Sequence, residues 1–170
     1  DIVKRLPTYH AIILAKNNTG RVNLYKLISE SHLTYYAKRP RIPKSLLLAH
    51  REGLILGSAC EAGELYRALL DDRSDADIAR IVNFYDYLEI QPTGNNKFMI
   101  NEEKIRNINS IEDIQDVNKR IVALGEQYNK PVVATCDVHF LDPGDEVYRR
   151  IIMAGKGFKD SDEQAPLYLR

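Results

Sequence analysis

The sequence predicts an α/β fold in which parallel strands are covered by helices. Four short apolar runs alternate with stretches in which apolar residues recur with helical spacing. Strands that alternate with helices are expected to be parallel, because a parallel neighbour is reached through a crossover connection. The chain has 170 residues, of which 44% are hydrophobic, so it can bury one ordinary core and is most simply a single domain.

The first half of the chain supplies two of the four expected strands. The run YHAIILAKN (9–17) is short and apolar and is closed by asparagines, which is typical of a strand covered on both faces. Near-helical spacing then predicts a helix over 21–33. Residues 35–45, which contain the basic stretch KRPR, are expected to form a loop that leads into a short helix from Pro43. GLILGSAC (53–60) is the second expected strand.

The second half of the chain continues the alternation. DYLEIQP (86–92) alternates as a strand does and is stopped by Pro92, and TGNNK (93–97) indicates a turn. Ser74 or Asp75 is expected to cap the helix that precedes this strand. The remaining expected elements are helices over 61–70, 75–85, 111–128 and 144–155, and a last strand over 131–135.

Composition and charge exclude several classes of protein. The chain carries 24 basic and 24 acidic residues, so its overall charge does not favour a nucleic-acid or anionic-membrane surface. No apolar stretch approaches the roughly 20 residues that span a bilayer, and the N-terminus lacks a signal peptide. We therefore expect a cytoplasmic protein whose two cysteines are thiols. Because the chain starts at Asp1 without Met, we interpret it as a fragment of a longer polypeptide.

Metal-binding side chains follow two of the expected strands. Asp137 and His139 come directly after the strand at 131–135, and side chains two residues apart in an extended segment point the same way. Together they offer an oxygen and a nitrogen to a divalent metal. Cys60 ends the second strand, and a thiolate is a good zinc ligand. His10 stands at the start of its strand, which counts against it on geometry alone.

Each of these residues also has a purely structural interpretation. An Asp-x-His at a strand end is more often a helix cap and a hydrogen-bonded loop histidine. A lone cysteine such as Cys60 is more often a small buried residue, and His32 and His50 are most simply surface or packing residues of helices. The KRPR stretch is interpreted as a solvated loop rather than a nucleic-acid contact.

Several sequence motifs, taken together in their order along the chain, favour the metal-binding interpretation over the structural one. The segments that carry a resemblance are YHAIILAKNNTGRVNLYKLISESHL, KRPRIPKSLLLAHREGLILGSACEAGEL, FYDYLEIQP and KPVVATCDVHFLD. In this order and spacing they resemble the PHP (polymerase and histidinol phosphatase) domain of bacterial replicative polymerases, above all those of the PolC type. The resemblance covers essentially the whole chain.

The resemblance implies a distorted (β/α)7 barrel with metal ligands at one mouth. The matching positions are His10 in YHAIIL, Cys60 in SAC, and Asp137 and His139 in CDVH. The family pattern therefore favours His10 in spite of its place at the start of a strand. The implied cofactor is a divalent metal, which is Zn, Mn or Mg, and no catalytic or further cofactor-binding residue is assigned.

One departure from the family pattern matters more than the matches. The His-x-His motif, a further His or Asp, and a Glu that normally precede YHAIIL do not occur here. In PolC-type polymerases an exonuclease domain is inserted into the PHP domain and splits its sequence. Residues 1–170 are therefore expected to be the C-terminal segment of a split PHP domain, with a partial barrel and a partial metal site.

The function implied is part of a replicative DNA-directed DNA polymerase, a nucleotidyltransferase. The segment is expected to scaffold the polymerase and 3′–5′ exonuclease modules and to be inactive alone. Its implied partners are DNA through the parent polymerase, the remaining PHP segment, and replisome subunits, with no membrane and with self-association through unpaired strand edges. The alternatives are a stand-alone PHP phosphoesterase and a structural module with a vestigial metal site.

Overall fold

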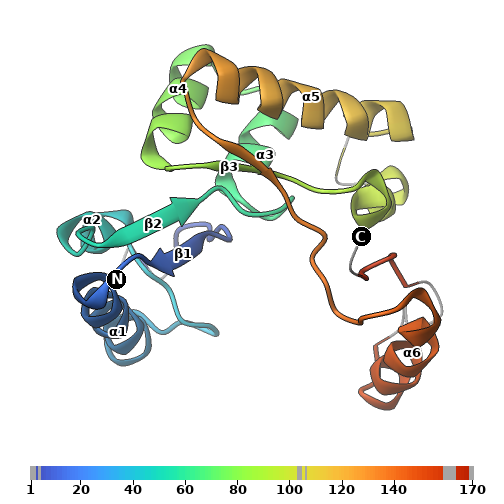
Figure 1. Cartoon of the computed structure of the whole chain (residues 1–170), viewed down its shortest axis with the longest axis horizontal. Coiled ribbons are helices and arrows are strands. Elements are labelled where there is room, and N and C mark those ends of the chain that lie inside the picture. The colour runs from blue at the N-terminus through green and yellow to red at the C-terminus, as the bar shows by residue number, and fades with distance from the viewer. Residues whose placement is uncertain (1–2, 4, 103–104, 106, 159–163, 169–170) are drawn as a thin grey trace.

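The computed structural model describes residues 3, 5–102, 105, 107–158 and 164–168. Helices and strands alternate as the sequence predicts, and the turn expected at 93–97 is the beginning of a 3₁₀ helix (Figure 1). In chain order the elements are β1 (Ile12–Ala15), α1 (Asn18–Leu33), α2 (Lys44–Ala49), β2 (Leu54–Gly57), α3 (Glu64–Leu70), α4 (Asp75–Phe84), β3 (Leu88–Ile90), η1 (Thr93–Asn101), α5 (Ile111–Gln127), β4 (Val132–Ala134), η2 (Pro143–Asp145) and α6 (Glu146–Gly155).

The strands within the described residues form two sheets of two strands each. β3 and β4 are parallel, with Leu88 opposite Val132, as predicted. β1 and β2 are antiparallel, with Ile12 opposite Gly57, so the prediction of parallel strands is wrong for this pair. An isolated parallel bridge between Gly57 and Tyr87 connects the two sheets. The α/β class is confirmed, and the sheets do not close into a barrel.

The antiparallel pairing of β1 and β2 follows from the path of the chain between them. The connection contains α1 and α2, and it returns to the end of β1 from which it left. The Lys16 N–H donates a hydrogen bond to the Gly53 carbonyl at 2.8 Å, so the last turn of this connection meets the end of β1. The beginning of β1 therefore lies beside the end of β2.

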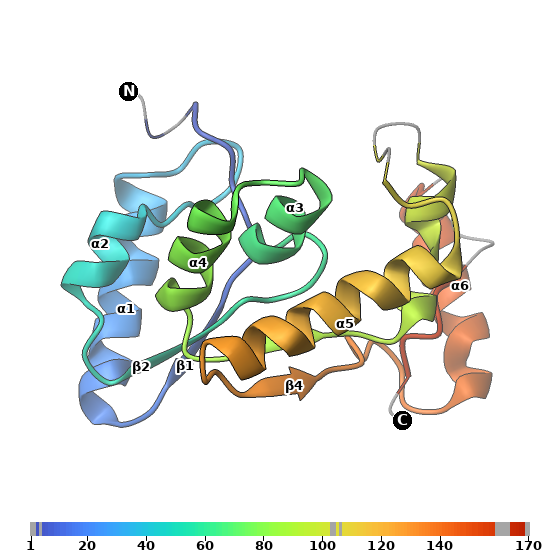
Figure 2. The same ribbon diagram turned by 90° about the horizontal axis from the view of Figure 1, so that it is seen from above.

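Helices α3, α4 and α5, which Figure 2 shows along the same side of the strands, supply most of the buried helical residues of the core, and Leu27 of α1, Leu47 of α2 and Met99 of η1 complete it. β2 and β3 are buried, whereas β1 and β4 are largely exposed. The expectation that the first strand is covered on both faces is therefore wrong, because Leu14 is 48% exposed. The largest fully buried apolar side chains are Leu27, Leu56, Leu65, Ile81, Leu88, Met99, Ile108, Ile114, Ile121 and Val82.

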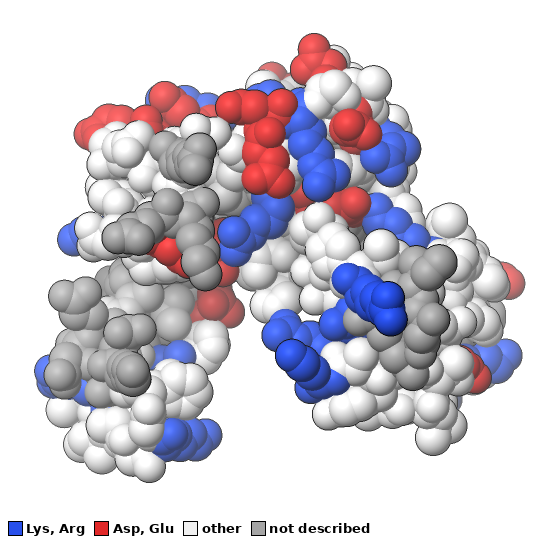
Figure 3. All heavy atoms as spheres, turned by 180° about the vertical axis from the view of Figure 1, so that it is seen from behind, with Lys and Arg blue, Asp and Glu red and all other residues white. Residues whose placement is uncertain are grey.

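Helix α6 stands apart from this core. It has no buried residue, and Tyr148, Ile151 and Ile152 are each more than half exposed. The space-filling view shows the molecule hollowed between the region of α6 and the region of β1 and β2 (Figure 3). Acidic and basic side chains are intermingled on this face, as the equal numbers of the two charges suggest. None of the helices described is both long and apolar enough to cross a bilayer.

Asp86 ties the end of β2 to the turn that enters β3. Its carboxylate accepts a hydrogen bond from the Leu56 N–H at 2.6 Å and pairs with the Arg51 guanidinium. Partial burial opposes ionisation, but the Leu56 N–H and the Arg51 guanidinium outweigh it and hold the pKa of Asp86 below its ordinary value. A carboxyl whose pKa is lower in the folded state stabilises the fold above its unfolded pKa, and this stabilisation disappears as the pH falls through the folded pKa.

We therefore expect Asp86→Asn to lower the free energy of unfolding at pH 7 by about 1 kcal/mol, because a charged hydrogen-bond acceptor is lost. The difference from the wild type should begin to shrink as the pH falls below about 4, where the unfolded carboxyl becomes protonated, and it should disappear as the pH falls through the lower pKa of the folded state. Urea unfolding of both proteins at pH 7 and pH 3 measures this. An equal difference at the two pH values would show that the charge of Asp86 does not contribute.

Candidate metal centre

His10 and Cys60 form the first pair of candidate ligands. The backbone N–H of His10 donates to the Ala62 carbonyl at 3.0 Å. The ring Nδ1 of His10 lies 3.6 Å from the Cys60 Sγ. Antiparallel pairing explains this contact, because it places the residue before β1 beside the loop after β2. The geometric argument against His10 assumed parallel strands and is therefore wrong.

Cys60 is a protonated thiol near neutral pH. Burial raises its pKa to about 11, and the neighbouring Glu61 carboxylate acts in the same direction, although an N–H of the loop opposes them. The loop itself is tight, because the Gly63 N–H donates to the Cys60 carbonyl at 2.8 Å and Ala59 has a φ of 59°. The thiol is thus held against an exposed imidazole in a rigid turn.

Asp137 and His139 form the second pair, after β4. The His139 Nδ1 lies 2.7 Å from the Asp137 carbonyl oxygen and 3.8 Å from the Asp137 Oδ1, and both side chains are exposed. Since a carbonyl can only accept, the hydrogen bond requires Nδ1–H and leaves the Nε2 lone pair available to a metal. The backbone N–H of His139 also donates to the Leu167 carbonyl at 2.8 Å, which holds the segment after β4 against residues 164–168.

A buried polar cluster that sequence reasoning missed supports the end of β4. The Glu89 Oε1 accepts hydrogen bonds from the Thr135 hydroxyl at 2.6 Å and from the Gln91 side-chain amide at 3.3 Å. The Glu89 N–H in turn donates to the Ser58 hydroxyl at 2.9 Å. Glu89 is only 6% exposed, and the signal in the sequence was a carboxylate and an amide at alternate positions of the apolar strand DYLEIQP.

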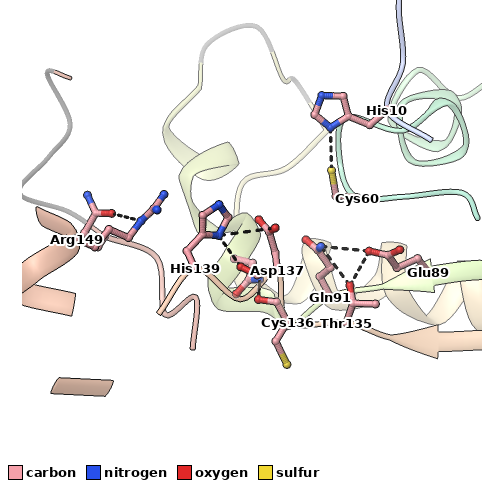
Figure 4. A network of polar contacts seen from close by, with 11 residues as sticks. His10, Cys60, Glu89, Gln91, Thr135, Cys136, Asp137, His139 and Arg149 are labelled. Carbon is pink, nitrogen blue, oxygen red and sulfur yellow. Dashed lines mark hydrogen bonds and ion pairs between the residues drawn. The ribbon is translucent and has the colours of Figure 1, made fainter. Parts of the chain in front are cut away.

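The four candidate ligands lie as two separate pairs (Figure 4). An imidazole with a thiol and an imidazole with a carboxylate are suitable donors for a divalent metal. Nevertheless, across the residues that the structure describes, no three His, Cys, Asp or Glu side chains gather closely enough to hold a metal ion. The described residues alone therefore do not make a complete metal site, and the convergence of the two pairs on one metal stays a prediction.

A cavity of about 780 Å³ opens beside the first pair. It is lined by His10 and by mostly apolar side chains, and it does not reach Asp137 or His139. Arg41 lines the cavity, and its guanidinium donates to the Leu6 carbonyl at 2.9 Å. Arg41 of the KRPR stretch therefore holds the segment around Leu6 in place, and the stretch is not a fully solvated loop. His32 and His50 bond to carbonyls of their own helices, as the structural interpretation expects.

Comparison with known proteins identifies relatives of the chain. The family model described as the PHP domain matches residues 1–93, which include the first candidate pair. A DNA polymerase III PolC-type from Clostridium perfringens is 58% identical over 168 residues, which is 99% of this chain and 11% of that protein. The enzyme of the same name from Caldanaerobacter subterraneus is 56% identical over 168 residues, with 99% and 12% covered.

More distant relatives carry the same name. The DNA polymerase III PolC-type of Bacillus subtilis is 42% identical over 154 residues, which is 91% of this chain and 10% of that protein. The chain thus spans only about a tenth of the length of the curated relatives that it matches. Because these alignments extend well beyond residue 93, the similarity includes the region of Asp137 and His139.

Proposed function

The chain belongs to the PHP domain family, and we propose that it is the C-terminal segment, residues 1–170, of a split PHP domain in a replicative DNA polymerase of the PolC type. The observation that carries this proposal is 58% identity to a PolC-type DNA polymerase III over 99% of the chain. On this proposal the parent protein is a nucleotidyltransferase that binds DNA, and it resides in the cytoplasm.

The exposure of apolar strands supports a domain completed by other parts of the parent. β1 and β4 have the sequences of covered strands, yet Leu14 is 48% and Val133 is 37% exposed. β1 pairs only with β2, and β4 only with β3, among the described residues, so each leaves one edge open. We propose that further strands of the parent pair with these edges and complete a distorted (β/α)7 barrel. In the isolated chain the same edges would favour self-association.

The two ligand pairs are proposed to be parts of one divalent metal site. The first pair belongs to the region of β1 and β2 and the second to the segment that leads to α6, and these regions flank the hollow in Figure 3. His10, Cys60, Asp137 and His139 would hold Zn, Mn or Mg together with ligands from the preceding PHP segment. The metal would supply Lewis-acid chemistry toward a phosphate ester. The loops of this chain would hold the side chains of these four ligands in place.

The segment is proposed to be inactive alone and to act as a scaffold. Its partners on this account are the preceding PHP segment, the exonuclease and polymerase modules, and replisome subunits. A second candidate, a structural module with a vestigial site, is favoured by one observation: within the described part of the chain the candidate ligands form pairs and no larger group.

A phosphodiesterase assay tests the proposal against a stand-alone phosphoesterase. The chain, loaded with Zn²⁺, Mn²⁺ or Mg²⁺, is incubated with bis(p-nitrophenyl) phosphate, and His139→Ala serves as the background. We expect no turnover above that of the variant, because neither pair alone provides an open metal site. Turnover that His139→Ala abolishes would contradict the proposal and establish an independent hydrolase.

A further inference from the structure

Two buried asparagines stand at the start of η1, between the elements that carry the candidate pairs. Asn95 is 7% and Asn96 is 1% exposed, although the sequence GNN is expected of an exposed turn. A buried side-chain amide costs free energy unless it is hydrogen-bonded, so buried amides usually have a defined partner. Asn95 has such a partner for its Nδ2, whereas the Oδ1 atoms of Asn95 and Asn96 have no hydrogen-bond partner among the described residues.

Asn95 bonds to the peptide that precedes the second candidate pair. Its Nδ2 donates to the Cys136 carbonyl at 2.8 Å, across 41 positions of sequence. That carbonyl belongs to the same peptide plane as the Asp137 N–H, so the bond fixes the orientation of this peptide. Asp137 has a φ of 49°, a left-handed conformation that aspartate adopts more readily than most residues but that is still less favourable than a negative φ, so a bond to this peptide helps to hold it.

The element that presents Asn95 is itself held in place. Met99 of η1 is fully buried in the core, and Asn96 is only 1% exposed. η1 is thus anchored in the core while Asn95 reaches the second pair.

We propose that Asn95 is a positioning residue for the Asp137/His139 pair. By holding the Cys136 carbonyl, it keeps Asp137 in its left-handed conformation and keeps both side chains directed to the same side of the chain. This role rests on the proposed function only in that the pair is taken to be part of a metal site. The positioning itself can be measured without metal.

The first test is amide hydrogen exchange by NMR on the metal-free chain. Asn95→Ala should speed exchange of the His139 amide, which donates to the Leu167 carbonyl, by about fivefold to tenfold, because one hydrogen bond that orders the segment is lost. Amides of the core, such as those of Leu88 and Ile121, should exchange at the wild-type rate. Asn23→Ala is the matched control, because the Asn23 Nδ2 makes the same kind of bond, at 2.9 Å, to the Glu52 carbonyl.

The second test adds Mn²⁺ and follows the paramagnetic broadening of the histidine ring signals. Asn95→Ala should need about tenfold more Mn²⁺ to broaden His139, with no change at His10, since partners that orient ligands typically contribute tenfold or more to affinity. Asn95→Ser keeps a shorter donor, so the Mn²⁺ concentration that it needs should lie between those of the wild type and Asn95→Ala. It replaces Asn95→Ala if that variant does not fold.

The two tests separate this inference from the proposed function. A wild-type exchange rate at His139 in Asn95→Ala, or an equal change in Asn23→Ala, would overturn the role of Asn95 whatever metal binds. Absence of Mn²⁺ broadening at His139 in the wild type would count against the metal role of the pair. The exchange rates would still decide whether Asn95 positions it.

Discussion

Replacing Gly63 with alanine is expected to separate His10 from Cys60 and to destabilise the chain by about 3 kcal/mol. A Cβ at this position would lie 2.2 Å from the Ser58 carbonyl oxygen and 2.9 Å from the Cys60 carbonyl oxygen. Both are backbone atoms, so no side-chain rotation relieves the clash. Gly63 has a φ of −74°, which alanine adopts readily, and the expected loss is therefore steric.

Urea unfolding and the NMR chemical shifts of the His10 ring measure these two effects. Gly155→Ala is the matched control, because a Cβ there meets no atom within 4 Å. Alanine at this position should slightly increase the stability of helix α6. A Gly63→Ala protein with wild-type stability and an unchanged His10 environment would show that the Cys60 loop is looser than the structure indicates.

Gly20→Ala should be the most damaging substitution in the packing of α1, with a loss of about 3 kcal/mol or more. Alanine normally stabilises a helix interior relative to glycine by up to about 1 kcal/mol. Here the added Cβ would lie 1.8 Å from the Gly53 carbonyl oxygen, the group to which the Lys16 N–H donates. The substitution must therefore push α1 away from the start of β2.

Alanine is expected to lower the stability at Gly20, where an ordinary helix position would gain stability, so the direction of the change decides between the two cases. Thermal unfolding monitored by circular dichroism should give a lower midpoint for Gly20→Ala and an equal or higher midpoint for Gly155→Ala. If both glycines respond as ordinary helix positions do, with a small gain from alanine, then α1 does not pack on Gly53 as described.

The helices were predictable from the sequence because their signals are local. Ser74 caps α4 through the Asp77 N–H, as one of the two alternatives predicted, and the apolar spacing of 111–128 gives α5 almost to the residue. Such signals act within one or two turns, so tertiary packing does not override them. The α/β class followed from the same alternation.

The pairing direction of β1 and β2 was not predictable in this way. It depends on where a connection of 38 residues, 16–53, brings the chain back, and the contact that decides this is between Lys16 and Gly53. The same error made His10 an unfavourable ligand on geometry, whereas the resemblance to the PHP family favoured it, and its role as a ligand stays a prediction. Long-range contacts of this kind have no signature within a single segment.

The role of η1 was hidden for a different reason. Gly, Asn and Lys in sequence are typical of an exposed turn, and the preference is a property of the local backbone. Burial of Asn95 and Asn96 arises from the fold around them, in which the Asn95 amide bonds to the Cys136 carbonyl. Asparagines in a turn between two candidate sites are therefore worth testing as supports of those sites.

The most direct test of the central proposal is the metal content of the intact parent polypeptide, measured by inductively coupled plasma mass spectrometry after gel filtration. Cys60→Ser and His139→Ala change one residue of each pair. If both pairs hold one site, each substitution alone should remove most of the bound metal that the wild type retains. Wild-type metal content in either variant would contradict the account, because that pair would then lie outside any metal site.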